Sequence, residues 1–408
     1  MEIKTFSERE IQQFRSDTRG TTEWTHFNNA GASLPPDEVV ETVIHYLNEE
    51  ARQGGYELEH QYKEQLENVY HLIARLIHAE KDEVAIVENA SMAWGLAFNG
   101  IEFQKGEVII TSEMEYVTNL LGFLNAEQTQ GIQIKVIPND EEGNFSLQAL
   151  EEAITAQTRL IAITHIASTA GAVLPVVEIG KIARKHNILY LLDACQTVGQ
   201  IPINVKEIGC DILSATGRKY LRGPRGTGFL YVRKEIQDTL KILLMDGHTA
   251  ELINENAFEI RKDARRFELF EKNRALTLGL GRAIEYALDI GLGRIWQRIQ
   301  FLAGLMRQQL GSIDGITVHD YGKQKSGIVT FTVNGVGSSH VKAELAEKKI
   351  HVSVGVAKST LIYMNRNSLS TVVRASIHYY NTEEEINRIC EALKSIVKSG
   401  VRLQHACG

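Results

Sequence analysis

A lysine at the end of a buried strand is the residue that most clearly could do chemistry in this sequence. Lys219 follows the apolar run DILSAT at 211–216 and precedes a glycine-rich loop, GPRGTG at 223–228. Burying an ammonium group costs several kcal/mol unless its pKa falls or the amine reacts. A desolvated lysine with a lowered pKa suits Schiff-base formation. The alternative is a lysine that has emerged into solvent beyond the strand.

A carboxylate and an amide follow another apolar strand. Asp193 lies near the end of the run ILYLLDA at 188–194, which places it 26 residues before Lys219 (219 − 193), and Gln196 comes soon after it. A carboxylate in this position can keep a pyridinium nitrogen protonated, so that an aromatic ring acts as an electron sink. Gln196 could then donate a hydrogen bond to a phenolic oxygen of that ring. Alternatively, Asp193 caps the loop that follows.

A third segment could hold a phosphate group. Asn89, Ala90 and Ser91 lie between the apolar run at 84–87 and a helix that we expect to begin near Met92. The free backbone N–H groups and the dipole at a helix N-terminus attract phosphate, and Ser91 adds a hydroxyl. Any capped helix has this pattern, so the segment has meaning only together with the other two.

These side chains are positioned by strands and helices that alternate between residues 84 and 232. The strand runs are apolar throughout, as expected for strands buried on both faces, and helical patterns at 146–156 and 176–187 separate some of them. The predicted fold class is therefore α/β, with a mainly parallel sheet flanked by helices and ligands at the carboxyl ends of the strands. The predicted strands are 84–87, 107–112, 132–138, 160–166, 188–194, 211–216 and 227–232.

The pattern changes in the last third of the chain. A long helical stretch from Asn273 to Gln309 is followed by a mixture of strands and helices, which predicts a smaller α+β domain. The last helix has Thr382 as its N-cap and an acidic first turn. The predicted strands are 315–321, 326–333 and 371–380, and the predicted helices are 340–350 and 382–400.

Composition and charge exclude several classes of protein. The 408 residues are 43% hydrophobic with a net charge of −7 and no basic run, so we expect no nucleic-acid partner. We find no signal peptide and no run of about 20 apolar residues, so we expect no membrane partner. The 13 histidines form no HxH or HExxH arrangement, so we expect no metal. The four cysteines form no CxxC pair and fit reduced thiols in the cytoplasm: Cys195, Cys210, Cys390 and Cys407.

The order of the motifs resembles a known family. DACQ at 193–196, TGRK at 216–219 and RASIHYYNTEEEI at 374–386 are similar to the class V aminotransferase family of fold-type I pyridoxal 5'-phosphate (PLP) enzymes. The resemblance begins at FNNAGAS, 27–33, and so covers nearly the whole chain. It implies PLP as cofactor, a small-molecule amino acid as substrate and a homodimer. It also implies three parts: an N-terminal segment at 1–25 that packs on the small domain, a large PLP-binding domain at 26–270, and a linking helix with the small C-terminal domain at 271–408.

The resemblance also assigns roles to residues. Lys219 would form the Schiff base and then move protons at the substrate α-carbon. Arg374 would grip the substrate α-carboxylate by a two-pronged contact, and Asn29 lies in an N-terminal loop over the active site. The residues around the cofactor would be Asp193 at the pyridine nitrogen, Gln196 at the phenolic oxygen, Tyr116 stacked on the ring, Ser168 beside it, and Ala90, Ser91, Thr216 and Arg218 at the phosphate.

Two departures from the family bear on the assembly and on the reaction. The F-E-x-G-T-P segment, which in relatives gives a phosphate ligand to the partner chain, reads FELFEK at 267–272, so that role is not carried over. The segment 351–373 contains no cysteine, although cysteine desulfurases carry a nucleophilic thiolate on this loop. Cysteine desulfurase is therefore the disfavoured alternative.

The favoured reaction follows from two strings. VSVGVAKST at 352–360 and RRFELFEKN at 265–273 resemble the branch with ergothioneine-pathway C–S lyases and isopenicillin N epimerase-like proteins. We therefore expect a C–S lyase that eliminates sulfur from a cysteine S-conjugate or sulfoxide. A class V aminotransferase, an epimerase and a non-catalytic PLP-binding protein remain alternatives, since PLP itself labilises any bond to the α-carbon. Arg374 argues against an amino-sugar aminotransferase, which has no carboxylate to bind.

Overall fold

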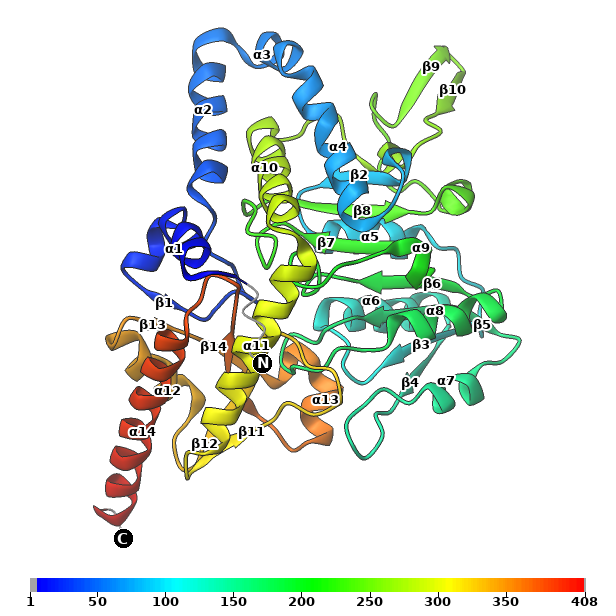
Figure 1. Cartoon of the computed structure of the whole chain (residues 1–408). Helices are drawn as coiled ribbons and strands as arrows, with labels where there is room; N and C mark the ends of the chain where they lie inside the picture. The colour runs from blue at the N-terminus through cyan, green and yellow to red at the C-terminus, as the bar shows by residue number, and fades with distance from the viewer. Residues whose placement is uncertain (1–5, 407–408) are drawn as a thin grey trace.

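A seven-stranded sheet forms the centre of the larger part of the molecule (Figure 1). The computed structural model describes residues 6–406, so Cys407 lies outside the described residues. The strand order is β2-β8-β7-β6-β5-β3-β4; neighbours from β7 to β4 are parallel, and β8 is antiparallel to both β7 and β2. The predicted α/β class with a mainly parallel sheet is confirmed. The strands are β2 (Val84–Val87), β3 (Val108–Ser112), β4 (Gln133–Ile137), β5 (Thr158–Thr164), β6 (Leu189–Asp193), β7 (Ile212–Thr216) and β8 (Gly228–Val232).

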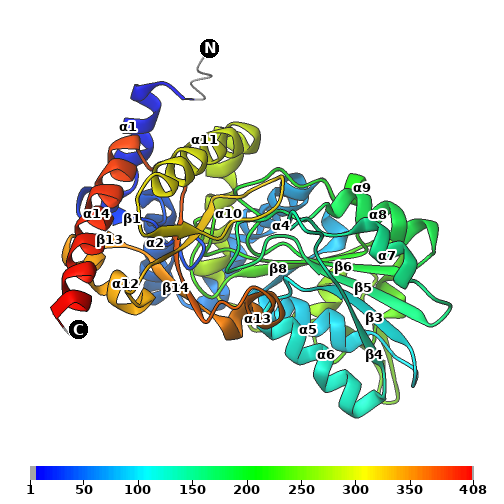
Figure 2. The same cartoon turned by 90° about the horizontal axis from the view of Figure 1, so that it is seen from below.

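Alternate residues of the central strands face two separate layers of helices (Figure 2). On β5, Leu160 and Ala162 pack in the apolar cluster with α5 and α6, whereas Ile161 and Ile163 pack in the cluster with α8 and α9 on the opposite face. Successive strand residues point to opposite faces, and both faces are buried here, as the uninterrupted apolar runs predict. The helices of this part are α2 (Asp37–Gln53), α3 (Gly55–Gln61), α4 (Lys63–Ile77), α5 (Ala90–Gly100), α6 (Val117–Gln130), α7 (Leu147–Ala153), α8 (Val176–Lys185) and α9 (Val205–Ile208).

Two helices, not one, connect the two sheets. The sequence predicts a continuous helical stretch from Asn273 to Gln309, but the structure has α10 (Arg274–Ile290) and α11 (Leu292–Gly311). Gly291 separates them with a φ of +91°, in the left-handed region that side chains disfavour and glycine tolerates. α10 packs against α2 and α4, and α11 leads to the second sheet.

The second sheet is antiparallel and has the strand order β11-β12-β15-β14. A separate apolar cluster joins it to α11, α12 and α14. The predicted strands and helices of this region are found, with bounds that differ by a few residues. The elements are β11 (Ile316–Val318), β12 (Ile328–Val333), α12 (Ser338–Glu347), β14 (Ser353–Val356), α13 (Leu361–Arg366), β15 (Thr371–Ser376) and α14 (Glu383–Ala406).

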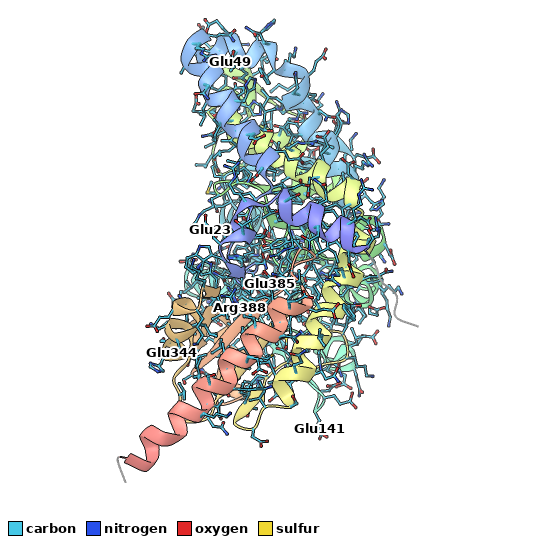
Figure 3. The ribbon with its side chains drawn as sticks, turned by 60° about the vertical axis from the view of Figure 1, so that its left-hand side comes forward. Glu23, Glu49, Glu141, Glu344, Glu385 and Arg388 are labelled. Atoms are coloured by element: carbon cyan, nitrogen blue, oxygen red, sulfur yellow. The ribbon has the colours of Figure 1, made fainter. Side chains whose placement is uncertain are left out.

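The N-terminal elements contact the C-terminal ones, although they are far apart in sequence (Figure 3). β1 (Thr25–His26) pairs in parallel with β13 (Ile350–His351). Arg15, at the end of α1 (Glu8–Ser16), forms an ion pair with Glu385 at 3.1 Å, and Arg388 donates to the Thr25 hydroxyl at 3.2 Å. The domain limits that the sequence suggests, after residues 25 and 270, stay a prediction.

A β-hairpin of β9 (Ala250–Asn254) and β10 (Ala257–Ile260), absent from the sequence prediction, projects from the large sheet region (Figure 1). Its strands carry exposed apolar side chains: Leu252, Ile253 and Phe258. Between residues 6 and 406, no helix combines the length and the apolarity needed to cross a membrane.

Candidate active site

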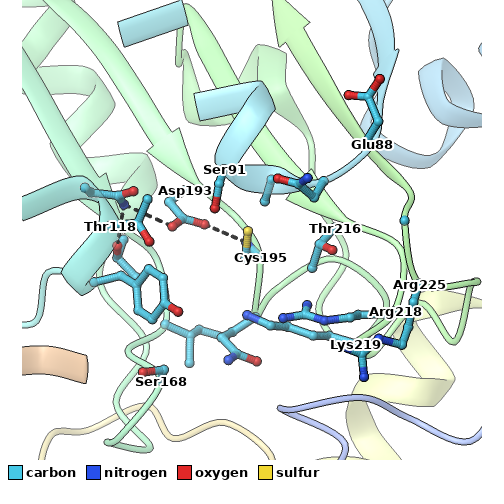
Figure 4. A pocket seen from close by; sticks show the side chains of 18 residues that line it. Glu88, Ser91, Thr118, Ser168, Asp193, Cys195, Thr216, Arg218, Lys219 and Arg225 are labelled. Atoms are coloured by element: carbon cyan, nitrogen blue, oxygen red, sulfur yellow. Dashed lines mark hydrogen bonds between the residues drawn. The ribbon is translucent and has the colours of Figure 1, made fainter. Parts of the chain in front are cut away.

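A cavity of about 320 Å³ lies at the carboxyl ends of the central strands (Figure 4). Nine of the residues that the sequence singles out line it together. They are Ala90, Ser91, Tyr116, Ser168, Asp193, Gln196, Thr216, Arg218 and Lys219. Arg374 and Asn29 are not in its lining. This placement agrees with the general rule that parallel sheets bind ligands at this edge.

Lys219 follows the end of β7 and is held by the turn after it. Burial lowers the pKa of the Lys219 ammonium, Cys195 and Asp193 oppose that effect, and the charges of Arg218 and Arg374 add to it. Among the described residues its ammonium has no hydrogen bond and no ion pair. A lysine with a lowered pKa and no partner is suited to act as a nucleophile and as a base.

Arg222 fixes the turn that carries Lys219, and the sequence analysis did not single it out. Its backbone N–H donates to the Lys219 carbonyl at 2.9 Å, and its φ of +62° closes the turn. Arg222 as a whole is 2% exposed, and its guanidinium donates to the Leu34 carbonyl at 2.8 Å and contacts the Tyr379 hydroxyl. An arginine next to a glycine-rich loop suggests a surface residue, so no signal in the sequence pointed to this role.

The Asp193 carboxylate lies at the end of β6 with both oxygens hydrogen-bonded. Oδ1 accepts from the backbone N–H of Cys195 at 2.9 Å, and Oδ2 accepts from the Asn119 amide at 3.0 Å. Hydrogen bonds from N–H groups stabilise the charged form of a carboxylate. Asn119 and Cys195 also line the cavity, and neither was predicted there.

Groups that attract anions lie on the side of the cavity opposite Asp193. α5 begins at Ala90 with Asn89 as its N-cap, whose Oδ1 accepts from the Met92 N–H at 3.0 Å, so the helix start is two residues earlier than expected. In Figure 4, Thr216, Arg218 and Arg225 lie to one side and Asp193 to the other. Arg225, which was not predicted, adds a second guanidinium to this side. A helix N-terminus with two arginines matches the chemistry of a phosphate.

Arg374 lies at a third edge of the site, on β15. Its Nη1 donates to the Ser168 carbonyl at 2.9 Å and its Nη2 to Asn28 Oδ1 at 3.3 Å, while its Nε has no partner. Among the described residues no carboxylate pairs with it. The Asn29 side chain, in contrast, is fully buried and donates to the Ser376 carbonyl at 2.7 Å. It is therefore Asn28 that reaches Arg374.

The polar groups of the cavity fit PLP. Gln196 Oε1 and Ser168 Oγ, both in the lining of the cavity, are buried atoms without a hydrogen-bond partner, and buried polar atoms normally have one. A polar ligand in the cavity would satisfy them. The cationic side has the chemistry of a phosphate site, Asp193 supplies a carboxylate for a pyridine nitrogen, and Lys219 supplies an amine.

Comparisons with known proteins agree with this cofactor. The Aminotransferase class-V family model matches residues 25–389. A probable cysteine desulfurase of Methanothermobacter thermautotrophicus is 30% identical over 396 residues, 95% of this chain and 98% of that protein. One from Pyrococcus abyssi is also 30% identical, with 95% and 98% covered. The apo structure of the cysteine desulfurase from Thermococcus onnurineus NA1 has a TM-score of 0.90 and 29% identity, covering 95% of this chain and 98% of that one.

These relatives correct the reaction expected from the sequence. The leading expectation was a C–S lyase acting on a cysteine S-conjugate or sulfoxide, with cysteine desulfurase disfavoured, and that expectation is wrong. It gave too much weight to the missing cysteine in 351–373. A missing thiol limits which group can accept sulfur, but it does not decide which bond the cofactor site breaks.

The match over most of the chain and the cavity that fits the cofactor lead to one identification. The protein is an enzyme that uses PLP, and the chain belongs to the class V aminotransferase family.

Proposed function

We propose that the protein is a cysteine desulfurase, which removes the sulfur of L-cysteine and leaves L-alanine. The observation that carries this proposal is the position of Lys219, an unpartnered lysine in the cavity that Asp193 also lines, with Arg374 nearby and free of any described carboxylate. Relatives named cysteine desulfurase, similar over nine-tenths of the chain or more, support the choice of substrate.

Each residue has a task that its surroundings suit. Bound PLP supplies an electron sink for bonds at the substrate α-carbon. Lys219, with its lowered pKa, takes and returns the proton at that carbon. Asp193 holds a proton at the pyridine nitrogen, and Arg374 orients the substrate by its carboxylate. Tyr116, which precedes α6 and lines the cavity, would cover the ring of PLP.

The cofactor is held by the groups on the cationic side of the cavity. We assign the phosphate to Ala90, Ser91, Thr216 and Arg218, as expected from the sequence, and add Arg225. Gln196 would donate to the phenolic oxygen of PLP, and Ser168 would lie beside the ring. The Asn29 side chain supports the loop over the site through its bond to the Ser376 carbonyl.

The sulfur acceptor is a thiol that does not come from the 351–373 segment. Between β14 and β15 this segment forms a short 3₁₀ turn and α13. The helix is fixed by the Tyr363 N–H, which donates to the Glu113 carbonyl at 3.0 Å, and by an ion pair between Arg366 and Glu113. Cys195 lines the cavity, but burial and then Asp193 raise the pKa of its thiol, which disfavours the reactive thiolate.

With an external thiol as the sulfur acceptor, the atoms and electrons of the reaction balance. L-Cysteine and a thiol RSH give L-alanine and the persulfide RSSH: the substrate C–S bond breaks, an S–S bond forms, and the thiol proton ends on the former sulfur-bearing carbon. The reaction needs no other oxidant or reductant.

The test is product analysis of the PLP-loaded protein with L-cysteine and a small dithiol. We expect L-alanine and sulfide in equal amounts, because the dithiol releases sulfide from the persulfide. Lys219→Ala should form neither, and Cys195→Ala should keep the activity. Pyruvate with ammonia in place of alanine, or a keto acid formed only when a second amino acceptor is added, would refute the proposal.

We also propose a homodimer in the cytoplasm. The apolar side chains of the β9–β10 hairpin are exposed in the single chain, with Leu252 at 78%, and apolar patches of this kind often mark protein interfaces. The described cysteines, Cys195, Cys210 and Cys390, are free thiols, as is typical of a reducing compartment. Light scattering of Leu252→Glu/Phe258→Glu should give a monomer if the hairpin forms the interface, and an unchanged dimer would rule it out.

A further inference from the structure

A buried carboxylate that the roles above leave unassigned lies behind the end of β6. Glu115 lies between β3 and α6 and is 2% exposed. Its Oε1 accepts hydrogen bonds from the Tyr116 backbone N–H at 2.8 Å and from the Thr164 hydroxyl, and its Oε2 accepts one from the Thr111 hydroxyl at 2.8 Å. Within the described part of the chain, no cation forms an ion pair with it. A buried carboxylate without a cation is costly and so suggests a function.

One amide joins Glu115 to the cofactor site. The Nδ2 atom of Asn119 donates to Glu115 Oε1 at 2.8 Å and to Asp193 Oδ2 at 3.0 Å. The same nitrogen also lies 3.3 Å from the Thr164 hydroxyl oxygen, but its contacts with the two carboxylates are shorter, and its two hydrogens can serve both carboxylates at the same time. Asn119 is 3% exposed, so water does not compete for these two bonds. The orientation of the Asp193 carboxylate therefore depends on an amide that Glu115 holds in place.

We propose that Glu115 is a positioning residue for Asp193, which acts through the Asn119 amide and sets how strongly a proton is held at the pyridine nitrogen of the cofactor. A second carboxylate near Asp193, in a site with little water, adds negative potential and favours a proton on the nearby nitrogen. The inference rests on the role proposed for Asp193 and is independent of which reaction follows.

The charge of Glu115 changes in the neutral pH range. Burial raises the pKa of Glu115 to about 7; the hydrogen bond from Thr164 opposes the rise and the charge of Asp193 adds to it. The groups that face Glu115 are Thr111 from β3, Thr164 from β5, Asn119 from α6 and Asp193 from β6, and of these only Asp193 is titratable. The protonation of the pyridine nitrogen should therefore change with pH as Glu115 gains or loses its charge.

The experiment measures the protonation of the pyridine nitrogen directly. The holoenzyme is prepared with ¹⁵N-labelled PLP, and the chemical shift of the pyridine nitrogen is followed by NMR from mildly acidic to alkaline pH. In the wild type we expect a step near pH 7, where Glu115 ionises. In Glu115→Gln, which keeps the shape and the Oε1 acceptor, we expect no step and a shift displaced toward the unprotonated value. A wild-type titration that Glu115→Gln leaves unchanged would overturn the proposal.

A control separates charge from structural loosening. Thr111→Val removes one hydrogen bond to the Glu115 carboxylate and leaves Asn119 untouched, so it should raise the pKa of Glu115 and move the step to higher pH. If Glu115→Gln does not fold, this variant decides alone: a step that moves upward supports the proposal, and a step that stays in place contradicts it.

Discussion

The cofactor side and the substrate side of the cavity are built in different ways. On the cofactor side, Asp193 and Thr216 end neighbouring parallel strands, Lys219 comes three residues after Thr216, and Ser91 lies in the first turn of the helix after β2. On the substrate side, Arg374 comes from the C-terminal sheet and meets Ser168 of the large sheet region and Asn28 of the N-terminal loop. One side depends on local strand ends, and the other on contacts between distant segments.

This difference predicts that substitutions on the two sides have different effects. Changes on the cofactor side should alter cofactor binding and chemistry together, because the same strand ends serve both. Changes on the substrate side should alter substrate use while the bound PLP stays.

Lys219→Ala should reduce the turnover of L-cysteine at least about 10³-fold, because the proton at the α-carbon then has no acceptor. The variant should also lose the visible absorbance band of lysine-linked PLP, which a spectrum of the reconstituted protein reveals. Lys219→Arg is the matched control, since it keeps the positive charge but cannot replace the amine. If it retained more than a tenth of the activity, Lys219 would not be the catalytic base.

Glu115→Gln should change how stability depends on pH. The pKa of Glu115 is about 7 in the folded protein and 4.5 without the influence of the fold, so the folded state holds more protons in this interval. The resulting stability is complete below pH 4.5 and is lost as the pH rises through about 7. The loss is roughly 3 kcal/mol. Urea unfolding of the apo protein should therefore show a flatter pH dependence for the variant, and parallel curves would contradict this.

How much of the site the sequence could predict follows the same division. The strand-end residues Asp193, Thr216 and Lys219 line one cavity, and the sequence could bring them together because buried parallel strands are recognisable as apolar runs and their ends meet at one edge. The bridge from Glu115 through Asn119 was missed. A polar residue between a strand and a helix looks like an ordinary cap, and its burial depends on the packing of β3 against β5.

The substrate side shows where sequence reasoning stops. Arg374 was selected by resemblance, but its neighbours Asn28 and Ser168 are 346 and 206 residues away along the chain, and no local pattern encodes such contacts. The break at Gly291 was missed for another reason, because a glycine within a helical pattern is compatible with a continuous helix.

Arg374→Ala should lower kcat/KM for L-cysteine about 10- to 100-fold, the equivalent of one or two charge-assisted hydrogen bonds. PLP content should remain as in the wild type, because the residue is not in the lining of the cofactor cavity. Cysteamine, which lacks the carboxylate, is the control substrate, and its slow turnover should not change. Loss of PLP from this variant would contradict the expectation that changes on the substrate side leave PLP binding intact.

Arg366→Gln should have the smallest effect and tests the fixed segment next to the substrate side. Its guanidinium pairs with Glu113, which is 5% exposed, and so fastens α13 to the end of β3. Because Arg366 itself is partly exposed, we expect the free energy that stabilises the folded segment to fall by about 1 kcal/mol or less. Hydrogen exchange should show faster exchange of the Tyr363 amide, which donates to the Glu113 carbonyl, and KM should rise severalfold with kcat nearly constant.

Lys358→Gln, on the same segment but without an ion pair among the described residues, is the matched control. If instead kcat rose in Arg366→Gln, the segment would limit turnover by its rigidity, and the substrate side would have to open during the reaction.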